Sequence, residues 1–178
     1  MSITVIKRFL LSLVEKLWRF VYNANIQKIR GGVSMQEIIK MLDENLECVD
    51  YNFNDGKIFI LIRSNKKEMK CPFCGTLSSK EHSSYKKTVQ DLPIQGNKVI
   101  LLIESRKMFC LNDKCSQKTF GERFSFLSRS PVKTDRLIDE IIAISLNCSS
   151  VAAAEILSRN TVDIGRSTVS RYIKKRDY

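Results

Sequence analysis

Four cysteines in two closely spaced pairs constrain this chain more than any other feature of its sequence. Two residues separate Cys71 from Cys74, and four separate Cys110 from Cys115. Such spacing lets one loop donate two thiolates to a tetrahedral zinc ion, and a second loop then completes a four-sulfur site. The first pair lies in the sequence CPFCG, whose proline and glycine favour a tight turn with backbone N–H groups directed at sulfur. The sequence therefore predicts a zinc ion bound by Cys71, Cys74, Cys110 and Cys115.

Zinc at this site is expected to stabilise the fold and not to catalyse a reaction, because four thiolates leave no open position for water. Cys48 and Cys148 stand alone among apolar neighbours, and we expect them to be packing residues. His82, the only histidine, is expected to be a surface or hydrogen-bonding residue. The cysteine spacing also favours the reducing cytoplasm over a set of disulfides.

Positive charge is concentrated in two parts of the chain. The 178 residues include 30 Lys and Arg against 19 Asp and Glu, a formal net charge of +11. Residues 57–133 carry 16 basic and 6 acidic side chains, whereas residues 1–56 carry 7 of each. A second basic group comprises Arg166, Arg171, Lys174, Lys175 and Arg176. Such a field favours nucleic acid as a partner, and the alternative is a solvated basic surface without one.

Residues 1–34 are expected to be an N-terminal amphipathic extension. Residues 3–22 show apolar side chains at helical spacing, but charged residues interrupt the pattern too often for a membrane span. Binding to a membrane surface and packing on another protein both remain open for this helix. Residues 30–33 can be encoded by a ribosome-binding sequence just before the codon of Met35. We therefore hypothesise that natural translation starts at Met35.

The rest of the chain is predicted to be an α+β protein that begins with a zinc-ribbon domain over residues 35–130. Asn54-Asp55-Gly56 is a strong turn signal between two strand-like runs, and Cys110 follows a second pair of such runs. The expected elements are a helix over 36–46, a hairpin of strands 48–53 and 57–63, and a strand pair over 84–91 and 98–109. Residues 117–131 look irregular, and their apolar side chains are expected to pack on a core: Phe120, Phe124, Phe126 and Leu127.

Residues 131–178 are predicted to form an α-helical domain with a helix-turn-helix. Helices are expected over 133–147, 151–158 and 166–175, the second capped by Ser149 or Ser150. Val169 and Ile173 would face inward, which leaves the polar side of the last helix free for a DNA major groove. An ordinary helical hairpin is the alternative, because the connection before the last helix is longer than usual. The expected DNA contacts on this helix are Arg166, Ser167, Thr168, Ser170, Arg171, Lys174 and Lys175.

Four further basic residues lie on the predicted strands that lead to the second cysteine pair. These are Lys86, Lys87, Arg106 and Lys107, and we expect them to contact DNA phosphates.

These features, in this order, resemble the N-terminal half of ISL-three family transposases, which move bacterial insertion sequences. The likeness covers about residues 36–175. The matching segments are CPFCG at 71–75, Asp91-Leu92-Pro93 after the basic Tyr85-Lys86-Lys87, RKMFCLNDKC at 106–115, and TFGERF at 119–124. The resemblance implies a zinc ribbon and a helix-turn-helix that recognise terminal inverted repeats. Full-length transposase is a further candidate partner.

In that family the catalytic domain, with its metal-binding acidic triad, would follow the helix-turn-helix, and no carboxylates here can be assigned to it. We therefore expect a truncated or split transposase fragment that binds DNA in the bacterial nucleoid, without catalysis, membrane attachment or a small-molecule substrate. The single histidine and the absence of nucleophile motifs and phosphate loops also count against an enzyme. A zinc-ribbon protein-interaction or regulatory module is the alternative.

Overall fold

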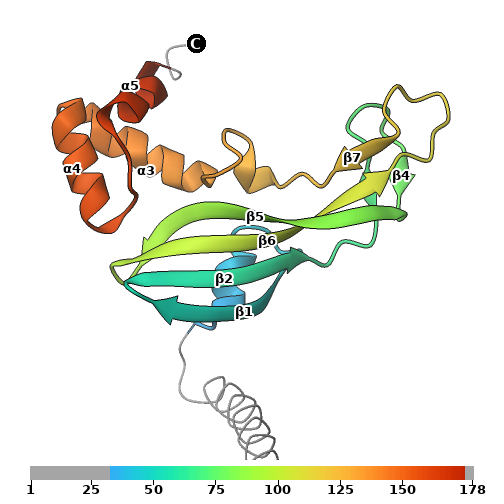
Figure 1. The fold of residues 1–178 in the computed structure, drawn as a ribbon, viewed down its shortest axis with the longest axis horizontal. Coiled ribbons are helices and arrows are strands. Elements are labelled where there is room, and N and C mark those ends of the chain that lie inside the picture. The colour runs from blue at the N-terminus through green and yellow to red at the C-terminus, as the bar shows by residue number, and fades with distance from the viewer. Residues whose placement is uncertain (1–32, 175–178) are drawn as a thin grey trace, which may run out of the picture. The chain divides into compact units, whose positions relative to one another are not determined.

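The computed structural model of the chain describes residues 33–174 (Figure 1). The expected helix over 3–22 and the predicted DNA contact Lys175 lie outside these residues. The chain divides into two compact units, Met1–Ile38 and Ile39–Tyr178, and each is described by itself.

The first unit contains the beginning of helix α2 (Met35–Lys40). The backbone N–H of Ser34 donates to Oε2 of Glu37 at 2.6 Å, and the backbone N–H of Glu37 donates to Oγ of Ser34 at 3.2 Å. This reciprocal pair is a capping box, which satisfies backbone donors that an N-terminal turn leaves free.

The helix expected over 36–46 is too long, because α2 ends at Lys40. Residues 41–45 form turns, in which Oδ1 of Asp43 accepts hydrogen bonds from both the backbone N–H and the side-chain amide of Asn45. Side chains such as Asp and Asn compete in this way with helical hydrogen bonds. Leu46 is 1% exposed and begins the first strand.

The second unit is built on a sheet whose strands run in the order β1-β2-β6-β5, with β7 paired to β6. The pairs β1·β2, β5·β6 and β6·β7 are antiparallel, and β2·β6 is parallel. Both expected strand pairs are therefore confirmed, with longer strands than predicted. The strands are β1 (Leu46–Asn54), β2 (Lys57–Ser64), β5 (Glu81–Ile94), β6 (Asn97–Phe109) and β7 (Thr119–Gly121).

Two tight turns close these hairpins. Asp55 and Gly56 have φ of +48° and +66°, and Gln95 and Gly96 have φ of +49° and +77°. Two successive positive φ values define a type I′ turn, whose twist matches that of a hairpin. Glycine at the second position adopts this conformation without a steric penalty.

The parallel pairing of β2 with β6 forms the buried face of the sheet. It places Ile58 beside Val99, Ile60 beside Leu101, and Ile62 beside Ile103, and each of these side chains is at most 1% exposed. Successive side chains in a strand point to opposite faces, so these alternate positions line one face. This pairing was not predicted, because the two strands are far apart in the sequence.

The long strands β5 and β6 continue from this sheet to the cysteine-containing segments (Figure 1). There the chain forms a small hairpin of β3 (Met69–Lys70) and β4 (Leu77–Ser78). The segment predicted to be irregular contains β7 and a 3₁₀ turn, η1 (Ser125–Leu127). Its aromatic residues Phe120, Phe124 and Phe126 are buried as expected, and Leu127 is half-buried.

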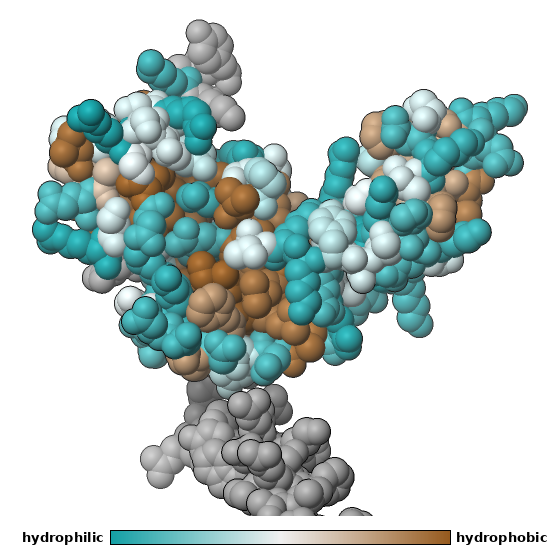
Figure 2. All heavy atoms as spheres, in the orientation of Figure 1, coloured by the Kyte–Doolittle hydropathy of each residue, from teal (hydrophilic) through white to brown (hydrophobic). Residues whose placement is uncertain are grey.

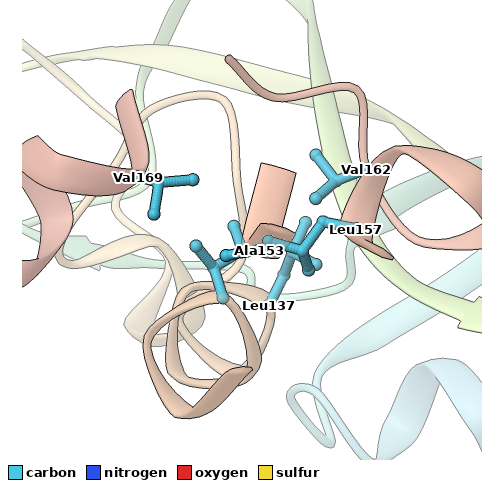
Figure 3. Packing of buried hydrophobic residues seen from close by; sticks show 6 residues of the cluster. Leu137, Ala153, Leu157, Val162 and Val169 are labelled. Atoms are coloured by element: carbon cyan, nitrogen blue, oxygen red, sulfur yellow. The ribbon is translucent and has the colours of Figure 1, made fainter. Parts of the chain in front are cut away.

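Three helices complete the second unit: α3 (Asp135–Leu146), α4 (Ser150–Asn160) and α5 (Arg166–Lys174). They pack around one apolar cluster (Figure 3), whose buried members are Leu137, Ile141, Ala153, Leu157, Val162 and Val169. The hydroxyl of Ser149 accepts from the backbone N–H of Ala152, so Ser149 caps α4. The hydroxyl of Thr134 caps α3 in the same way.

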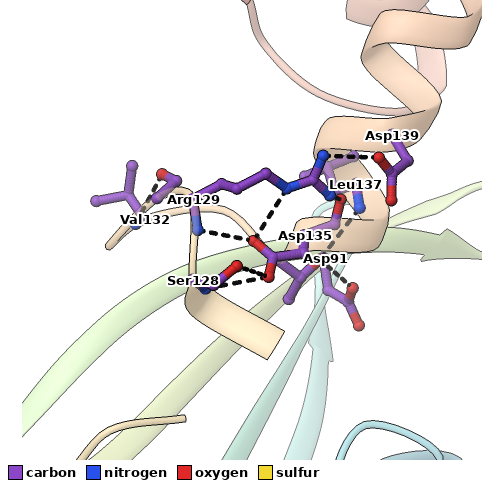
Figure 4. A network of polar contacts seen from close by, with 9 residues as sticks. Asp91, Ser128, Arg129, Val132, Asp135, Leu137 and Asp139 are labelled. Atoms are coloured by element: carbon purple, nitrogen blue, oxygen red, sulfur yellow. Dashed lines mark hydrogen bonds and ion pairs between the residues drawn. The ribbon is translucent and has the colours of Figure 1, made fainter. Parts of the chain in front are cut away.

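Polar contacts fix the start of α3 (Figure 4). The carboxylate of Asp135 accepts hydrogen bonds from the backbone N–H and hydroxyl of Ser128 and from the backbone N–H of Arg129. The Arg129 guanidinium donates to Asp139 at 2.7 Å. Residues 132–134 also join the edge of β5, where the backbone of Gln90 bonds Val132 and Thr134.

Candidate metal centre and nucleic-acid interface

The four predicted cysteine ligands converge. Their sulfur atoms all lie within 4.8 Å of one another, with Cys71 and Cys115 4.0 Å apart and Cys74 and Cys110 3.5 Å apart. A tetrahedral zinc with Zn–S bonds of about 2.3 Å separates its sulfurs by about 3.8 Å. The donor set and its spacing therefore fit a zinc ion. No other group of three or more His, Cys, Asp or Glu side chains within residues 33–174 is arranged to hold a metal.

The first pair of cysteines lies in the turn between β3 and β4. The backbone N–H of Gly75 donates to the carbonyl of Cys71 at 2.8 Å, and that of Cys71 donates to the carbonyl of Thr76 at 2.9 Å. Gly75 has φ of +77°, a value that strongly favours glycine, so the CPFCG sequence accounts for this turn.

The second pair lies in the loop between β6 and β7. The side-chain Oδ1 of Asn112 accepts from the backbone N–H of Lys114 at 3.0 Å, and its carbonyl accepts from that of Cys115 at 3.0 Å. The backbone N–H of Gln117 points at Sγ of Cys115 at 3.5 Å, a contact that stabilises a thiolate.

The centre has a buried side and an exposed side. Cys71 and Cys115 are 2% and 8% exposed and pack with Met69, Met108 and Phe120. Cys74 is exposed and Cys110 is half-buried. One face of the metal site therefore anchors it to an apolar cluster, and the other is open to solvent.

Without metal, the thiols of the exposed pair differ in acidity. Hydrogen bonding to the hydroxyl and backbone N–H of Thr76 lowers the pKa of Cys74 to about 6. The backbone N–H of Asn112 lowers the pKa of Cys110, but desolvation and the neighbouring cysteines outweigh it and raise that pKa to about 12. Both sulfurs would have to be deprotonated to hold a zinc ion, so metal binding at this centre would release protons.

His82 is not a ligand. Its ring lies 4.8 Å from the ring of Phe109, and its Nδ1 is 2.9 Å from the Ser83 hydroxyl. The side chain is exposed, in agreement with the expected surface role.

The four basic residues expected to contact phosphate occupy different environments. Lys86 and Lys107 are exposed. Lys87 is half-buried, with its Nζ 5.5 Å from the ring centroid of Tyr85 and 5.7 Å from that of Phe124. Lys86 and Lys107 therefore remain available to a partner, whereas Lys87 is partly held by aromatic rings.

Arg106 has a structural role in this fold. Its guanidinium donates to both carboxylate oxygens of Glu122, at 3.2 and 3.3 Å, and to the carbonyl of Lys66 at 2.8 Å. Nε and Nη2 are thus engaged in structural contacts, and we do not retain Arg106 among the proposed phosphate contacts. Glu122 is 5% exposed. The sequence element TFGERF contains this carboxylate, but its partner could not be inferred from the sequence.

The residues expected to contact DNA on α5 lie mostly on its solvent side. Arg166, Ser167, Arg171 and Lys174 are exposed, and Thr168 and Ser170 are half-buried. Val169 is fully buried and Ile173 packs on the same cluster, as expected. The hydroxyl of Ser170 donates to the carbonyl of Arg166 at 3.1 Å.

Two cysteine-bearing loops that bring four sulfurs together at the ends of short hairpins define a zinc ribbon. Residues 67–115 match a family described as the zinc-finger of transposase IS204/IS1001/IS1096/IS1165. No curated protein and no solved structure is similar enough to this chain to be matched. The chain therefore contains a transposase-type zinc ribbon over these residues, with zinc as the expected metal.

The matched segment ends at Cys115 and does not include the three helices. No catalytic domain is evident in the part of the chain that the structure describes. None of its helices is long and apolar enough to cross a membrane.

Proposed function

We propose that this chain is a zinc-dependent DNA-binding module of an ISL-three family transposase, and that it recognises the terminal inverted repeats of an insertion sequence without catalysing transposition. The observation that carries this proposal is that α5 has a buried apolar side and an exposed basic side. Val169 is fixed in the core, while the cationic side chains of Arg166, Arg171 and Lys174 are exposed. A helix presented in this way can enter the major groove, and arginine there can read guanine.

In this proposal α4 and α5 act as a helix-turn-helix. The connection between them, residues 161–165, is five residues long, compared with the usual three or four. Val162 within it is fully buried, so the longer connection is anchored to the helical core. Arg166 and Ser167 stand in the first turn of α5, where free backbone N–H groups also favour phosphate.

The zinc ribbon would add phosphate contacts through Lys86 and Lys107. Phosphate contacts give affinity and orientation, whereas base contacts give sequence preference. A ribbon that binds phosphate and a helix that reads bases would together account for recognition of a defined DNA end.

The experiment that tests this proposal begins with selection of bound duplexes from a random library by the zinc-loaded full chain. Affinity for the selected duplex and for a scrambled duplex is then measured over a range of salt concentrations. We expect a preference for the selected duplex and a steep fall in affinity with salt. Arg166→Ala/Arg171→Ala should remove that preference.

Arg63→Ala is the matched control, because Arg63 is exposed on β2 and pairs with Glu47. It should bind like the parent chain. A parent chain that prefers no duplex, or an α5 double variant that keeps the full preference, would contradict recognition by α5.

A protein-interaction module is the second candidate, and one surface favours it. Leu146, Val151 and Ile156 are about half exposed or more, at 54%, 59% and 49%. Ile156 also lines a shallow pocket of about 430 Å³ between α3 and α4, together with Ala143, Ile144, Asn147 and Cys148. A full-length transposase is the proposed partner, and a Val151→Asp/Ile156→Asp variant that still bound it would argue against this candidate.

A further inference from the structure

We propose that the solvent-facing end of the zinc ribbon is a second DNA-contacting surface, separate from α5, in which apolar side chains meet the sugars and bases and lysines meet the phosphates. This knuckle tip comprises Phe73, Leu77, Leu111, Lys70, Lys80, Lys114 and Lys118. It rests on the proposed function in that DNA is the ligand, and it adds a separate set of ribbon contacts to those proposed for Lys86 and Lys107.

Three apolar side chains are exposed around the metal centre. Phe73 is 57% exposed, Leu77 50% and Leu111 53%. Exposure of three large apolar side chains in so small a lobe is a feature of interaction sites. Figure 2 shows apolar residues among hydrophilic ones over the end of the molecule that carries β4 and β7.

The metal ligands set the position of two of these side chains. Phe73 directly precedes Cys74 and Leu111 directly follows Cys110, and the sulfurs of these two cysteines are 3.5 Å apart. They form the exposed side of the centre. Zinc bound there would therefore fix the backbone of both knuckles and keep Phe73 and Leu111 next to the two ligands on the exposed side of the centre.

Positive charge surrounds this apolar group. Residues 66–87 and 105–118 together contain ten Lys and Arg and three Asp and Glu, and two of the ten, Lys66 and Arg106, pair with carboxylates outside these ranges. Lys70 lies directly opposite Leu77 in the β3·β4 pair. Lys80, Lys114 and Lys118 are exposed, and no carboxylate within residues 33–174 forms an ion pair with any of these four lysines.

This composition selects DNA over a protein partner. Lysine is depleted in protein–protein interfaces, whose cores favour aromatic residues without many ammonium groups. Apolar side chains flanked by lysines instead suit nucleic acid, because the side chains contact sugar and base surfaces while the lysines displace counterions from phosphate. Lys118 also donates to the carbonyl of Asp113 at 3.2 Å, which holds its ammonium beside the second knuckle.

The test uses the zinc-loaded full chain and a duplex labelled for fluorescence anisotropy. Phe73→Ala is compared with Phe53→Ala, since Phe53 is a phenylalanine of similar exposure, 64%, on β1. We expect Phe73→Ala to weaken binding about tenfold, because burial of a large apolar side chain against the duplex contributes a free energy of about this size. The salt slope should not change, and Phe53→Ala should have no effect. Zinc content measured in each sample verifies that the centre is intact.

Lys114→Ala/Lys118→Ala provides a second readout that does not depend on Phe73. Both side chains are exposed, but the variant removes the hydrogen bond from Lys118 to the carbonyl of Asp113, so its zinc content is measured as well. It should weaken binding. It should also flatten the slope of log binding constant against log salt concentration by about one for each phosphate that is no longer neutralised.

Three outcomes are distinguishable. Weaker binding by the Phe73 and lysine variants, with an unaffected Phe53 variant, supports the knuckle tip. Unchanged binding by both, with the preference for the selected duplex lost only in Arg166→Ala/Arg171→Ala, overturns the knuckle tip and leaves the proposed function intact. No duplex binding by the parent chain overturns both proposals and points to a protein partner for this surface.

Discussion

Asp91 on β5 and Arg136 on α3 form an ion pair that connects the sheet to the helices. The Asp91 side chain is 3% exposed and that of Arg136 is 35% exposed. The hydroxyl of Thr134 also donates to Asp91 at 2.6 Å. A hydrogen bond to this carboxylate raises the pKa of Arg136 above its ordinary value, because it stabilises the charged guanidinium. Asp91 thus holds together the hydroxyl that caps α3 and the first turn of that helix.

We predict that Asp91→Asn lowers the free energy of unfolding by about 2 kcal/mol, because it leaves a half-buried guanidinium without its charged partner. Chemical denaturation of the zinc-loaded chain measures this. Glu155→Gln is the control, since Glu155 pairs with Arg159 on the surface of α4 with both side chains about 70% exposed. That change should cost less than about 1 kcal/mol. An equal loss of unfolding free energy in the two variants would mean that Asp91 does not connect the sheet to the helices.

Arg106 offers a second test, because the sequence suggested DNA contact and the structure places its guanidinium against Glu122. Arg106→Lys keeps the charge but cannot form the two-pronged contact with a carboxylate. We predict that this variant loses zinc to a chelator faster than the parent chain, with the ribbon destabilised by about 1–2 kcal/mol. Lys107→Ala, at the neighbouring exposed position, should leave the rate of zinc loss unchanged and weaken only DNA binding. An Arg106→Lys variant as stable as the parent chain would return Arg106 to the set of phosphate contacts.

The strands and the metal centre were predictable because their signals are local. Asn54-Asp55-Gly56 specifies a turn within a few residues. Each of the two short cysteine spacings specifies one half of the zinc site. The convergence of all four sulfurs within 4.8 Å agrees with that prediction.

Long-range pairings were not predictable in this way. Nothing local specifies that Ile60 lies beside Leu101 in a parallel pair, or that Arg106 meets Glu122, which is sixteen residues away. The sequence alone does not distinguish a basic side chain that faces solvent from one that pairs with a buried carboxylate. Prediction of helix ends was also limited. The apolar pattern continues to Leu42, but α2 ends at Lys40, before the turn formed by Asp43 and Asn45.

Metal removal is expected to unfold the ribbon. Structural zinc contributes on the order of 10 kcal/mol to the folding of small domains, and here the apolar cluster around Cys71 and Cys115 has few other members. We predict one zinc per chain, and loss of protection of the amides in β3, β4 and β7 from hydrogen exchange after chelation. Cys74→Ser should have the same effect, whereas Cys48→Ser, remote from the four-sulfur cluster, should keep the zinc. A Cys74 variant with unchanged zinc content and melting temperature would refute the assignment.

The packing of α5 on the helical core can be tested through its buried residue Val169. Val169 is fully buried, so Val169→Ala should leave a cavity and lower the free energy of unfolding by about 2 kcal/mol. Val151→Ala, at a valine that is 59% exposed on α4, should change it by less than about 0.5 kcal/mol. Denaturation curves of the two variants are compared under the same zinc concentration. Equal stabilities would indicate that α5 is not held by this contact.

The start of α3 should be sensitive to acid. Burial acts to raise the pKa of Asp135, but hydrogen bonds from Ser128 and Arg129 and the charge of Arg129 outweigh it and lower that pKa below its ordinary value of 3.8. A carboxyl whose pKa is lowered by folding stabilises the protein above its unfolded pKa, and this contribution is lost as the pH falls through the folded pKa. Asp135→Asn should therefore be less stable than the parent chain by about 1 kcal/mol at pH 6, with the difference shrinking below about pH 4.

Comparing the stability of the variant with that of the parent chain at each pH cancels the loss of zinc in acid, which affects both chains. Asp139→Asn, whose carboxylate is 68% exposed on the same helix, is the control and should show a difference near zero throughout. A stability difference for Asp135→Asn that stayed constant from about pH 6 to about pH 3 would show that the ionised carboxylate does not hold this end of the helix.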